Sequence, residues 1–149
     1  MHSLRIGNKL VGKNHPCYII AEIGSNFDGS LTKAKKLIKL AKESGADCAK
    51  FQSFLTKELL SPTGFKDKVT FQAKWKKSVW NMYEDAEFPR KWYKVLSRYA
   101  DTIGIHFMFT PYDYAAVDIL EENKTPAYKI GSGDITYLEF LKYIARKTK

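Results

Sequence analysis

The sequence is poor in cysteine and histidine, with two cysteines and three histidines among 149 residues. Cys17 and Cys48 are too few for a disulfide framework, and we expect them on opposite faces of neighbouring strands, unbridged, as in a reducing compartment. The histidines are scattered, and no group of histidine, cysteine and carboxylate has the spacing of metal ligands. We therefore expect any metal ion to take its ligands from outside this chain.

Long apolar runs are also absent. No stretch reaches the roughly 18 to 20 consecutive apolar residues of a membrane span, and residues 1–13 lack the apolar core of a signal peptide. This predicts a cytoplasmic protein without a membrane partner. The chain has the length of one domain, and its 44% hydrophobic residues suffice for a core, which excludes wholesale disorder.

Acidic residues are outnumbered, because 25 lysines and arginines against 16 aspartates and glutamates leave a formal net charge of +9. Such a charge favours anionic partners, whether nucleic acid, lipid or small phosphates. The basic residues are dispersed, however, and those of residues 33–42 are typical of a solvated helix face. A non-catalytic module that binds nucleic acid or an acidic partner is thus an alternative that rests on charge alone, and the sequence contains no nucleic-acid-binding motif.

Strands and helices alternate along the chain. A turn at Gly7-Asn8 predicts a short β-hairpin over 4–11. Apolar runs predict strands, and apolar residues at helical spacing predict helices, several of them bounded by caps such as Ser30 and Gly104. The expected strands are 17–23, 47–53, 105–110 and 127–130, and the expected helices are 31–44, 89–103, 113–122 and 137–146.

Four strand-helix units without consecutive strands indicate an α/β fold with a parallel sheet, either doubly wound or closed into a barrel. An eight-unit TIM-type barrel needs about 250 residues, so in the barrel alternative the chain is the first half, with an open edge. The end of the sequence has no glycine stop and no following strand, which favours that alternative. A long insertion over 54–88, with a short helix expected around 71–79, lies where functional loops are common.

Polar residues occupy one face of the expected strands near their carboxyl ends. The side chains of Glu22, Lys50, Gln52, Thr110 and Lys129 all alternate onto the face away from the helices. A single strand lysine is commonly a side chain that extends to solvent at the rim of the sheet. Two buried lysines, an acid, an amide and a hydroxyl together instead predict a pocket for an anionic, polyhydroxylated ligand.

The fourth expected strand leads directly into Gly131-Ser132-Gly133-Asp134. Small residues after a strand lysine let backbone N–H groups turn toward a bound anion, with Ser132 adding a hydroxyl. This predicts a phosphate cradle. The alternative is a plain strand-to-helix turn that Asp134 caps. His106 lies toward the start of its strand, where we expect packing and assign no role.

Several motifs in one order resemble the sialic acid synthase family over nearly the whole chain. They are His15-Pro16-Cys17, Ile20-Ala21-Glu22-Ile23-Gly24, Asn26, Gly45-Ala46-Asp47-Cys48-Ala49-Lys50-Phe51-Gln52, Thr110-Pro111 and Tyr128-Lys129-Ile130-Gly131-Ser132-Gly133-Asp134. The resemblance implies that residues 1–149 form the N-terminal half of an eight-unit barrel. The second half and a small antifreeze-like domain would then lie outside them.

The resemblance also implies a reaction. Family members condense phosphoenolpyruvate with an N-acetylmannosamine-type sugar into a sialic acid and release phosphate, with the aldehyde activated by a divalent metal, Mn or Mg. It implies that Lys50, Lys129 and Ser132 hold the phosphate and carboxylate, and that Glu22 and Gln52 face the sugar or the attacking water. The remaining substrate-binding residues that we expect are Asn26, Thr110 and Asp134. A homodimer is implied for the full-length enzyme.

Two points qualify the resemblance. Many relatives have histidine after the asparagine of the first strand exit, where this chain has Phe27, so the sequence leaves open whether this position makes a sugar contact or serves as a proton relay. Related alternatives are synthases of legionaminic or pseudaminic acid and other phosphoenolpyruvate-dependent synthases of keto-deoxy sugar acids. Because the metal ligands implied for the family lie elsewhere, we predict that the 149-residue chain alone has no appreciable synthase activity.

Overall fold

A three-stranded parallel sheet forms the centre of the fold. The structure is a computed structural model that describes residues 3–63 and 74–147. The sheet order is β3-β4-β5, with Glu22 beside Lys50, Lys50 beside Met108, and Gln52 beside Thr110. Its strands are β3 (Ile20–Gly24), β4 (Cys48–Ser53) and β5 (His106–Pro111). The expected α/β fold with a parallel sheet is therefore confirmed.

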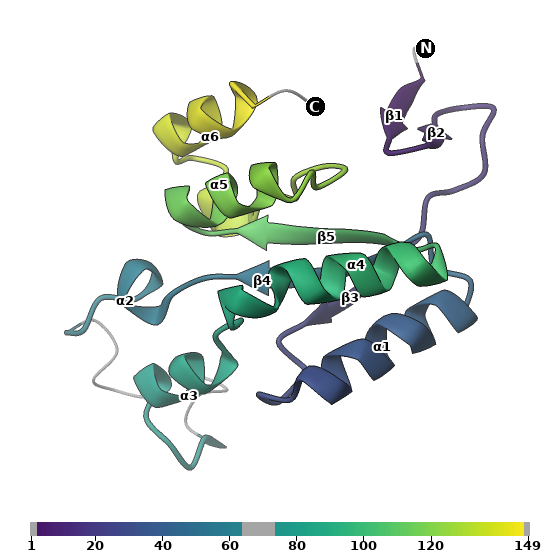
Figure 1. Cartoon of the computed structure of the whole chain (residues 1–149). Coiled ribbons are helices and arrows are strands. Elements are labelled where there is room, and N and C mark those ends of the chain that lie inside the picture. Colours follow the sequence, from purple (N-terminus) through teal and green to yellow (C-terminus); the bar gives the residue numbers. More distant parts are fainter. Residues whose placement is uncertain (1–2, 64–73, 148–149) are drawn as a thin grey trace.

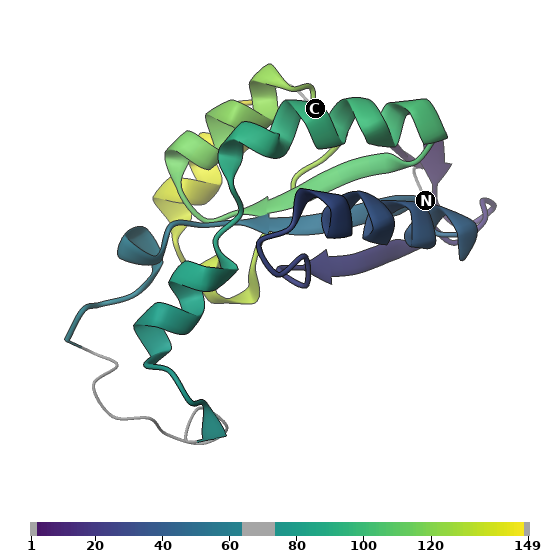
Figure 2. The same ribbon diagram turned by 60° about the horizontal axis from the view of Figure 1, so that its bottom comes forward.

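The longer helices cover one face of this sheet and leave the other face free of helices (Figures 1 and 2). The Ser30 hydroxyl caps the first of them by accepting from Lys33 N, and Asp113 caps the third in the same way. Gly104 ends the second in a left-handed conformation, with a φ of 68°. The helices are α1 (Leu31–Glu43), α4 (Tyr93–Ile103), α5 (Tyr114–Glu122) and α6 (Leu138–Ala145), with a 3-10 turn at Arg90–Trp92 before α4.

Aromatic side chains fill the layer between sheet and helices. Phe51, Phe88 and Phe109 are almost fully buried, and the rings of Phe88 and Phe109 meet edge to face with centroids 4.8 Å apart. Phe27 is completely buried in the same cluster, with its ring centroid 5.7 Å from that of Phe88. The aromatic residues of this layer therefore form the core.

The fourth expected strand, 127–130, is reduced to a single parallel bridge between Phe109 and Tyr128. Only β5 is available as a partner for this segment among the described residues, and one backbone bond, from Lys129 N to Phe109 O at 3.3 Å, follows it. Local bonds replace the ladder, because the Thr125 hydroxyl donates to Ala127 O. An edge segment with this pairing is too weakly held to extend as a strand.

The insertion between β4 and α4 also differs from expectation. It contains α2 (Thr56–Leu59) and α3 (Val79–Ala86). The helix expected around 71–79 thus corresponds to α3, which begins at Val79, where the expected helix was to end. The Ser78 side chain sets this start by accepting from Asn81 N at 3.1 Å. Residues 71–73 of the expected helix lie outside the described residues.

Cys17 precedes β3, which begins at Ile20, so it does not lie on a strand as expected. Cys17 is exposed and Cys48 is buried, and both are free. Within the described ranges, no helix has the length and apolar character needed to cross a membrane.

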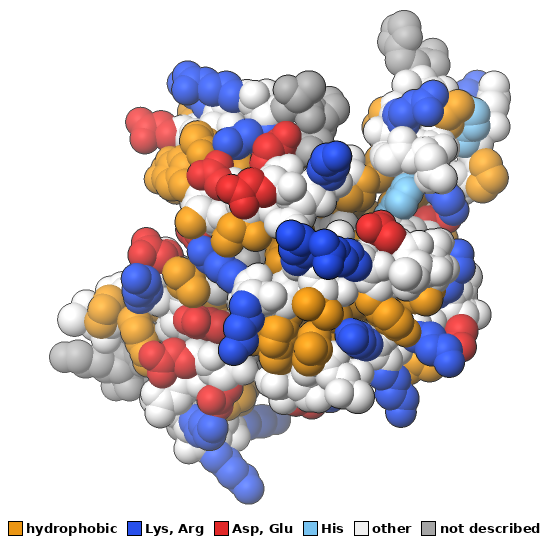
Figure 3. Space-filling view, viewed as in Figure 1, with side chains coloured by type: hydrophobic (Ala, Val, Ile, Leu, Met, Phe, Trp, Pro, Cys, Tyr) orange, Lys and Arg blue, Asp and Glu red, His pale blue; other side chains and the backbone are white. Residues whose placement is uncertain are grey.

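The lysines of α1 have local partners rather than forming a bare cationic face. Figure 3 shows lysine and arginine side chains over several elements, with acidic side chains between them. Lys42 donates to Gly104 O at 2.7 Å and so ties α1 to the end of α4. Three of the other four contact Asp28 (Lys33), Glu43 (Lys39) and the Tyr99 ring (Lys35). These contacts agree with the expected solvated helix face.

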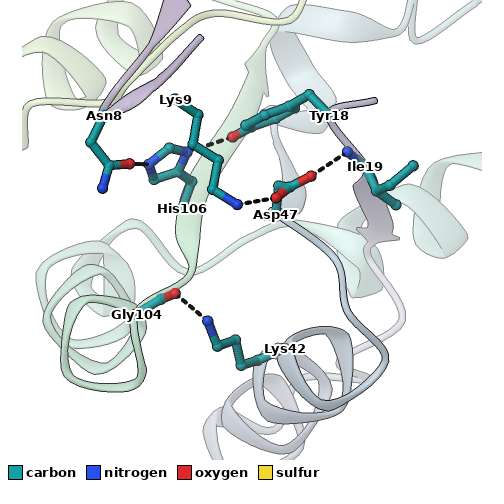
Figure 4. Close-up of polar contacts among 8 residues, drawn as sticks. All are labelled: Asn8, Lys9, Tyr18, Ile19, Lys42, Asp47, Gly104 and His106. Atoms are coloured by element: carbon teal, nitrogen blue, oxygen red, sulfur yellow. Dashed lines mark hydrogen bonds and ion pairs between the residues drawn. The ribbon is translucent and has the colours of Figure 1, made fainter. Parts of the chain in front are cut away.

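The predicted hairpin packs against the amino-terminal end of the sheet (Figure 4). Its strands are β1 (Leu4–Ile6) and β2 (Lys9–Val11), and Lys9 forms an ion pair with Asp47. His106 lies between the hairpin and the sheet, with Nε2 2.9 Å from Asn8 Oδ1 and Nδ1 2.6 Å from the Tyr18 hydroxyl. The expectation that His106 has a packing role is consistent with these contacts.

Candidate functional site

Lys50 is the centre of a polar cluster at the carboxyl ends of the strands. Its side chain is 7% exposed, and its Nζ forms an ion pair with Glu22 on β3. On the other side, Nζ lies 3.4 Å from the Thr110 hydroxyl on β5. Glu22 lies opposite Lys50, and Thr110 lies two residues beyond the position opposite Lys50 on β5, so three parallel strands bring an acid, an amine and a hydroxyl together on the face away from the helices.

Burial makes this lysine dependent on its neighbours. Removing an ammonium group from water costs several kcal/mol, which only ion pairs and hydrogen bonds offset. The Glu22 side chain is 55% exposed, so the pair opens to solvent on the carboxylate side. An ammonium group has three donors, and two neighbours leave capacity for an anion that arrives from that side.

Gln52 lies next to this cluster, at the point where β3 ends at Gly24. A Cβ at Gly24 would lie 3.6 Å from Glu22 Oε1 and 3.9 Å from Gln52 Nε2. Gly24 also has a φ of 57°, which favours glycine, and the register of β3 shifts there. The bend after Glu22 therefore brings the acid and the amide to the same point.

Asn26 is exposed and turned toward its own loop. Its side-chain amide donates to Ile23 O at 2.9 Å, so it supports the turn that leaves β3. Phe27 follows it with its ring in the aromatic core. The side chain at position 27 therefore belongs to the core of the fold.

The expected phosphate cradle is a 3-10 turn, Ser132–Asp134. Gly131 before it is buried, and a Cβ there would lie 3.0 Å from Asp134 Oδ2 and 3.1 Å from the Tyr112 ring. A side chain at this position would therefore have to displace the Asp134 carboxylate and the Tyr112 ring by a few tenths of an ångström. The turn does not use Asp134 as a side-chain cap for α6, whose N-cap is Tyr137, so the alternative of a capping aspartate is wrong.

Asp134 has an unusual environment. Its Oδ2 is buried without a hydrogen-bond partner in the described part of the chain, and burial raises the pKa of this carboxyl above its ordinary value. Ser132, in contrast, is exposed. The loop thus offers a free hydroxyl above a partly desolvated acid.

Lys129 does not join the Lys50 cluster in this structure. It is exposed, and its Nζ donates to the neighbouring Ile130 carbonyl. The structure therefore brings Glu22, Lys50 and Thr110 into contact with Gln52 beside them. It leaves Lys129 at the rim.

Tyr112 is a site residue that the sequence analysis missed. Burial raises its pKa, and the nearby carboxylates of Asp134 and Glu22 raise it further. The Tyr112 ring lies against Gly131, since a Cβ at Gly131 would come within 3.1 Å of it. The place of Tyr112 directly after β5, two residues beyond Thr110, is the signal in the sequence that could have found it.

The described residues do not by themselves form a divalent-metal site. Over 3–63 and 74–147, no group of three or more histidine, cysteine, aspartate and glutamate side chains is placed to hold an ion. The single carboxylate of the cluster, Glu22, is already paired with Lys50.

Comparisons with known proteins show which family the chain resembles. The family model described as "NeuB family" matches residues 37–149. Human N-acetylneuraminate-9-phosphate synthase is 40% identical over 137 residues, 92% of this chain and 38% of that protein. The N,N'-diacetyllegionaminic acid synthase of Campylobacter jejuni is 42% identical over 134 residues, 88% of this chain and 40% of that protein.

A solved structure has the same fold. The N-acetylneuraminic acid synthetase of Leptospira borgpetersenii, solved in complex with citrate, superposes with a TM-score of 0.83 at 29% identity. The match covers 98% of this chain and 47% of that chain. This chain spans about two fifths of the length of the two curated relatives. From its motifs, its fold and these matches, the chain belongs to the NeuB family.

Proposed function

We propose that residues 1–149 are the first half of an eight-unit barrel, in an enzyme that condenses phosphoenolpyruvate with an N-acetylmannosamine-type sugar and releases phosphate. One observation carries the proposal: the buried Lys50, held by Glu22 and Thr110 at the carboxyl ends of adjacent parallel strands. Active sites of parallel barrels form at that end. The helix-free face of the sheet fits the interior of such a barrel.

Each residue receives a role from its chemistry. Lys50 binds the phosphate or carboxylate of phosphoenolpyruvate, because a buried ammonium attracts an anion more strongly than one in water. Lys129 and Ser132, both exposed, close on the same anion from the adjoining loop. Glu22 accepts a proton from the attacking water once the anion takes its place at Lys50, and Thr110, Asn26, Gln52 and Asp134 contact the substrates.

The rest of the enzyme is also part of the proposal. Mn or Mg would take its ligands from outside the described residues, and none of the roles above depends on it. We place the full-length enzyme in the cytoplasm as a homodimer. Its partners are small molecules rather than nucleic acid or membrane.

Calorimetric titration of phosphoenolpyruvate tests the anion site. We expect the chain to bind it, and we expect Lys50→Met and Lys129→Ala to weaken binding by about ten-fold or more, as for a lost charge-assisted contact. Lys36→Ala, at an exposed lysine of α1, is the matched control and should leave affinity unchanged. Circular dichroism confirms folding. A folded chain without affinity, or variants that bind like the parent, would contradict the proposal.

A second experiment tests the reaction. The corresponding segment of the Campylobacter jejuni N,N'-diacetyllegionaminic acid synthase is replaced by this chain, and phosphate release is measured with a panel of amino sugars and aldose phosphates. We expect turnover with phosphoenolpyruvate and N-acetylmannosamine that Lys50→Met abolishes. Turnover only with a diacetamido sugar would favour a legionaminic-type synthase, to which this chain is 42% identical.

A further inference from the structure

Tyr112 is attached to the sheet rather than to the loop that it touches. It directly follows β5, and its backbone N donates to Ser53 O, at the end of β4, at 3.1 Å. Its ring meets the ring of Phe54 edge to face, with centroids 6.1 Å apart, and Phe54 itself is buried. The ring is therefore held at a set position beside the carboxyl ends of two parallel strands.

The 131–134 loop meets this ring where its own pairing with the sheet is weak. In the described part of the chain, the segment before the loop pairs with β5 through one bridge and the bond from Lys129 N to Phe109 O. At Gly131 the loop then reaches Tyr112, because a Cβ at Gly131 would lie 3.1 Å from a ring carbon and 3.3 Å from the hydroxyl oxygen. Tyr112 thus adds a packing contact that places the loop over the strand ends.

Asp134 closes over the same point. Its Oδ2 lies 3.0 Å from the position of that Cβ, and its backbone N donates to Gly131 O at 3.0 Å. The Tyr112 hydroxyl oxygen and Asp134 Oδ2 are therefore both within 3.3 Å of one point. No hydrogen bond joins them, since Oδ2 is buried without a partner among residues 3–63 and 74–147. A buried carboxylate oxygen without a donor is costly, so a small shift that pairs the two groups is favourable.

An anion on the loop increases the need for such a donor. Ser132, which we propose to bind the anion, is exposed and lies between Gly131 and Asp134 in the sequence. A phosphate there would bring negative charge close to the Asp134 carboxylate, and like charges disfavour each other. A tyrosine hydroxyl donates to a carboxylate without adding charge. Burial raises the pKa of Tyr112, so this hydroxyl keeps its proton at neutral pH.

From this geometry we propose that Tyr112 is a positioning residue of the anion site. Its ring fixes the 131–134 loop over the strand ends, and its hydroxyl donates to Asp134 Oδ2 when a phosphate group occupies the loop. Asp134 is then held against Tyr112, and Ser132 is left directed at the phosphate. This inference rests on the proposed function and adds to it a residue that acts through Asp134 rather than by touching phosphoenolpyruvate.

Tyr112→Phe tests the hydroxyl, because it keeps the ring and its packing. We expect this variant to bind phosphoenolpyruvate and inorganic phosphate about five-fold more weakly in calorimetry, the worth of one hydrogen bond. Tyr83→Phe is the matched control, since the Tyr83 ring also packs against Phe54, at 5.8 Å, but is not among the groups nearest to a Cβ at Gly131. It should leave both affinities unchanged. Equal losses in the two variants, or no loss in Tyr112→Phe, overturn the proposal.

A double-mutant cycle tests whether Tyr112 acts through Asp134. Asp134→Ala removes the acceptor, and adding Tyr112→Phe to it should cause little further loss of phosphoenolpyruvate affinity. Losses that multiply in the double variant would contradict a role through Asp134. Tyr112→Ala, which also removes the ring, should weaken binding more than Tyr112→Phe, and equal effects would show that the ring does not place the loop. Circular dichroism confirms that each variant is folded.

Kinetics of the chimeric enzyme separate positioning from general damage. Tyr112→Phe should raise KM for phosphoenolpyruvate about five-fold, as for one lost hydrogen bond, and leave KM for the sugar unchanged. A parallel rise in both KM values contradicts the proposal.

The role of Tyr112 and the proposed function fail in different ways. Phosphoenolpyruvate binding that depends on Lys50 but is indifferent to Tyr112→Phe refutes only the role of Tyr112. A folded parent chain that does not bind phosphoenolpyruvate refutes both.

Discussion

Gly7 in the hairpin turn lies directly against the His106 imidazole, so that a Cβ at Gly7 would come within 2.7 Å of Nε2. The turn also has a φ of 56° at this position. Hairpin and sheet therefore fit together only with a glycine here, for both steric and conformational reasons.

Gly7→Ala should destabilise the fold more than Gly29→Ala. Both glycines have positive φ, which costs an alanine roughly 1–2 kcal/mol, but nothing lies within 4 Å of a Cβ at Gly29. The contact with His106 should add about 1 kcal/mol or more to the cost at Gly7. Urea unfolding of the two variants and the parent measures the difference. Equal losses would show that the hairpin shifts freely.

Stability should fall as pH drops below the ordinary histidine pKa of about 6.5. Burial lowers the pKa of His106, and Lys9 lowers it further, against smaller opposing effects of Asp47 and Asp101. The unfolded chain then binds more protons than the folded chain as pH falls from about 6.5, so folding loses free energy in that window.

His106→Gln should flatten this slope, because glutamine keeps hydrogen-bonding capacity for Asn8 and Tyr18 without titrating. Urea midpoints between pH 7.5 and 5 give the slope. Asp47 titrates in a lower window, since bonds from Lys9 and Ile19 N depress its pKa. A parent protein whose stability does not change over this range would contradict the prediction.

Glu22→Gln should destabilise the chain in the absence of ligand, whereas Lys50→Met should not. Loss of the acid leaves the buried ammonium without its counter-charge, while loss of the amine leaves a carboxylate that is 55% exposed. Because solvent screens that side of the pair, we expect about 1–2 kcal/mol for Glu22→Gln. Chemical unfolding at pH 7 compares the two variants. The reverse order would show that Lys50 needs no partner.

The 149-residue chain alone should not turn over substrate. The described residues include the proposed anion site, but they provide no group of side chains placed to hold a metal ion. Phosphate release from phosphoenolpyruvate and N-acetylmannosamine, measured with Mn or Mg, should stay at the background rate. Metal-dependent release by the folded chain would show that this half is complete in itself.

The sequence predicted the elements whose periodicity is strong. Strand alternation placed Glu22, Lys50 and Thr110 on one face, and the structure brings them into contact. The helix caps at Ser30 and Gly104 were also predicted, because each cap depends on only a few neighbouring residues. Local chemistry of this kind can be read without knowing the tertiary contacts.

Features that depend on distant partners were missed. The 127–130 segment has the composition of a strand but meets only β5, so it forms one bridge. Lys129 has the parity of a site residue, yet its long side chain turns to its own backbone. Tyr112 was overlooked because its closeness to Asp134 depends on how the last loop folds back.

The complete burial of Phe27 has a consequence for the loop that carries it. Asn26 and Asp28, on either side, are exposed, while the Phe27 carbonyl accepts from Ser30 N at 2.9 Å at the start of α1. Phe27 thus anchors the middle of the loop in the aromatic core. The polar residues on either side of it, Asn26 and Asp28, are each only one residue away from this anchor. Repacking around Phe27 would therefore change how far the side chains of Asn26 and Asp28 can move, although neither residue itself would be substituted.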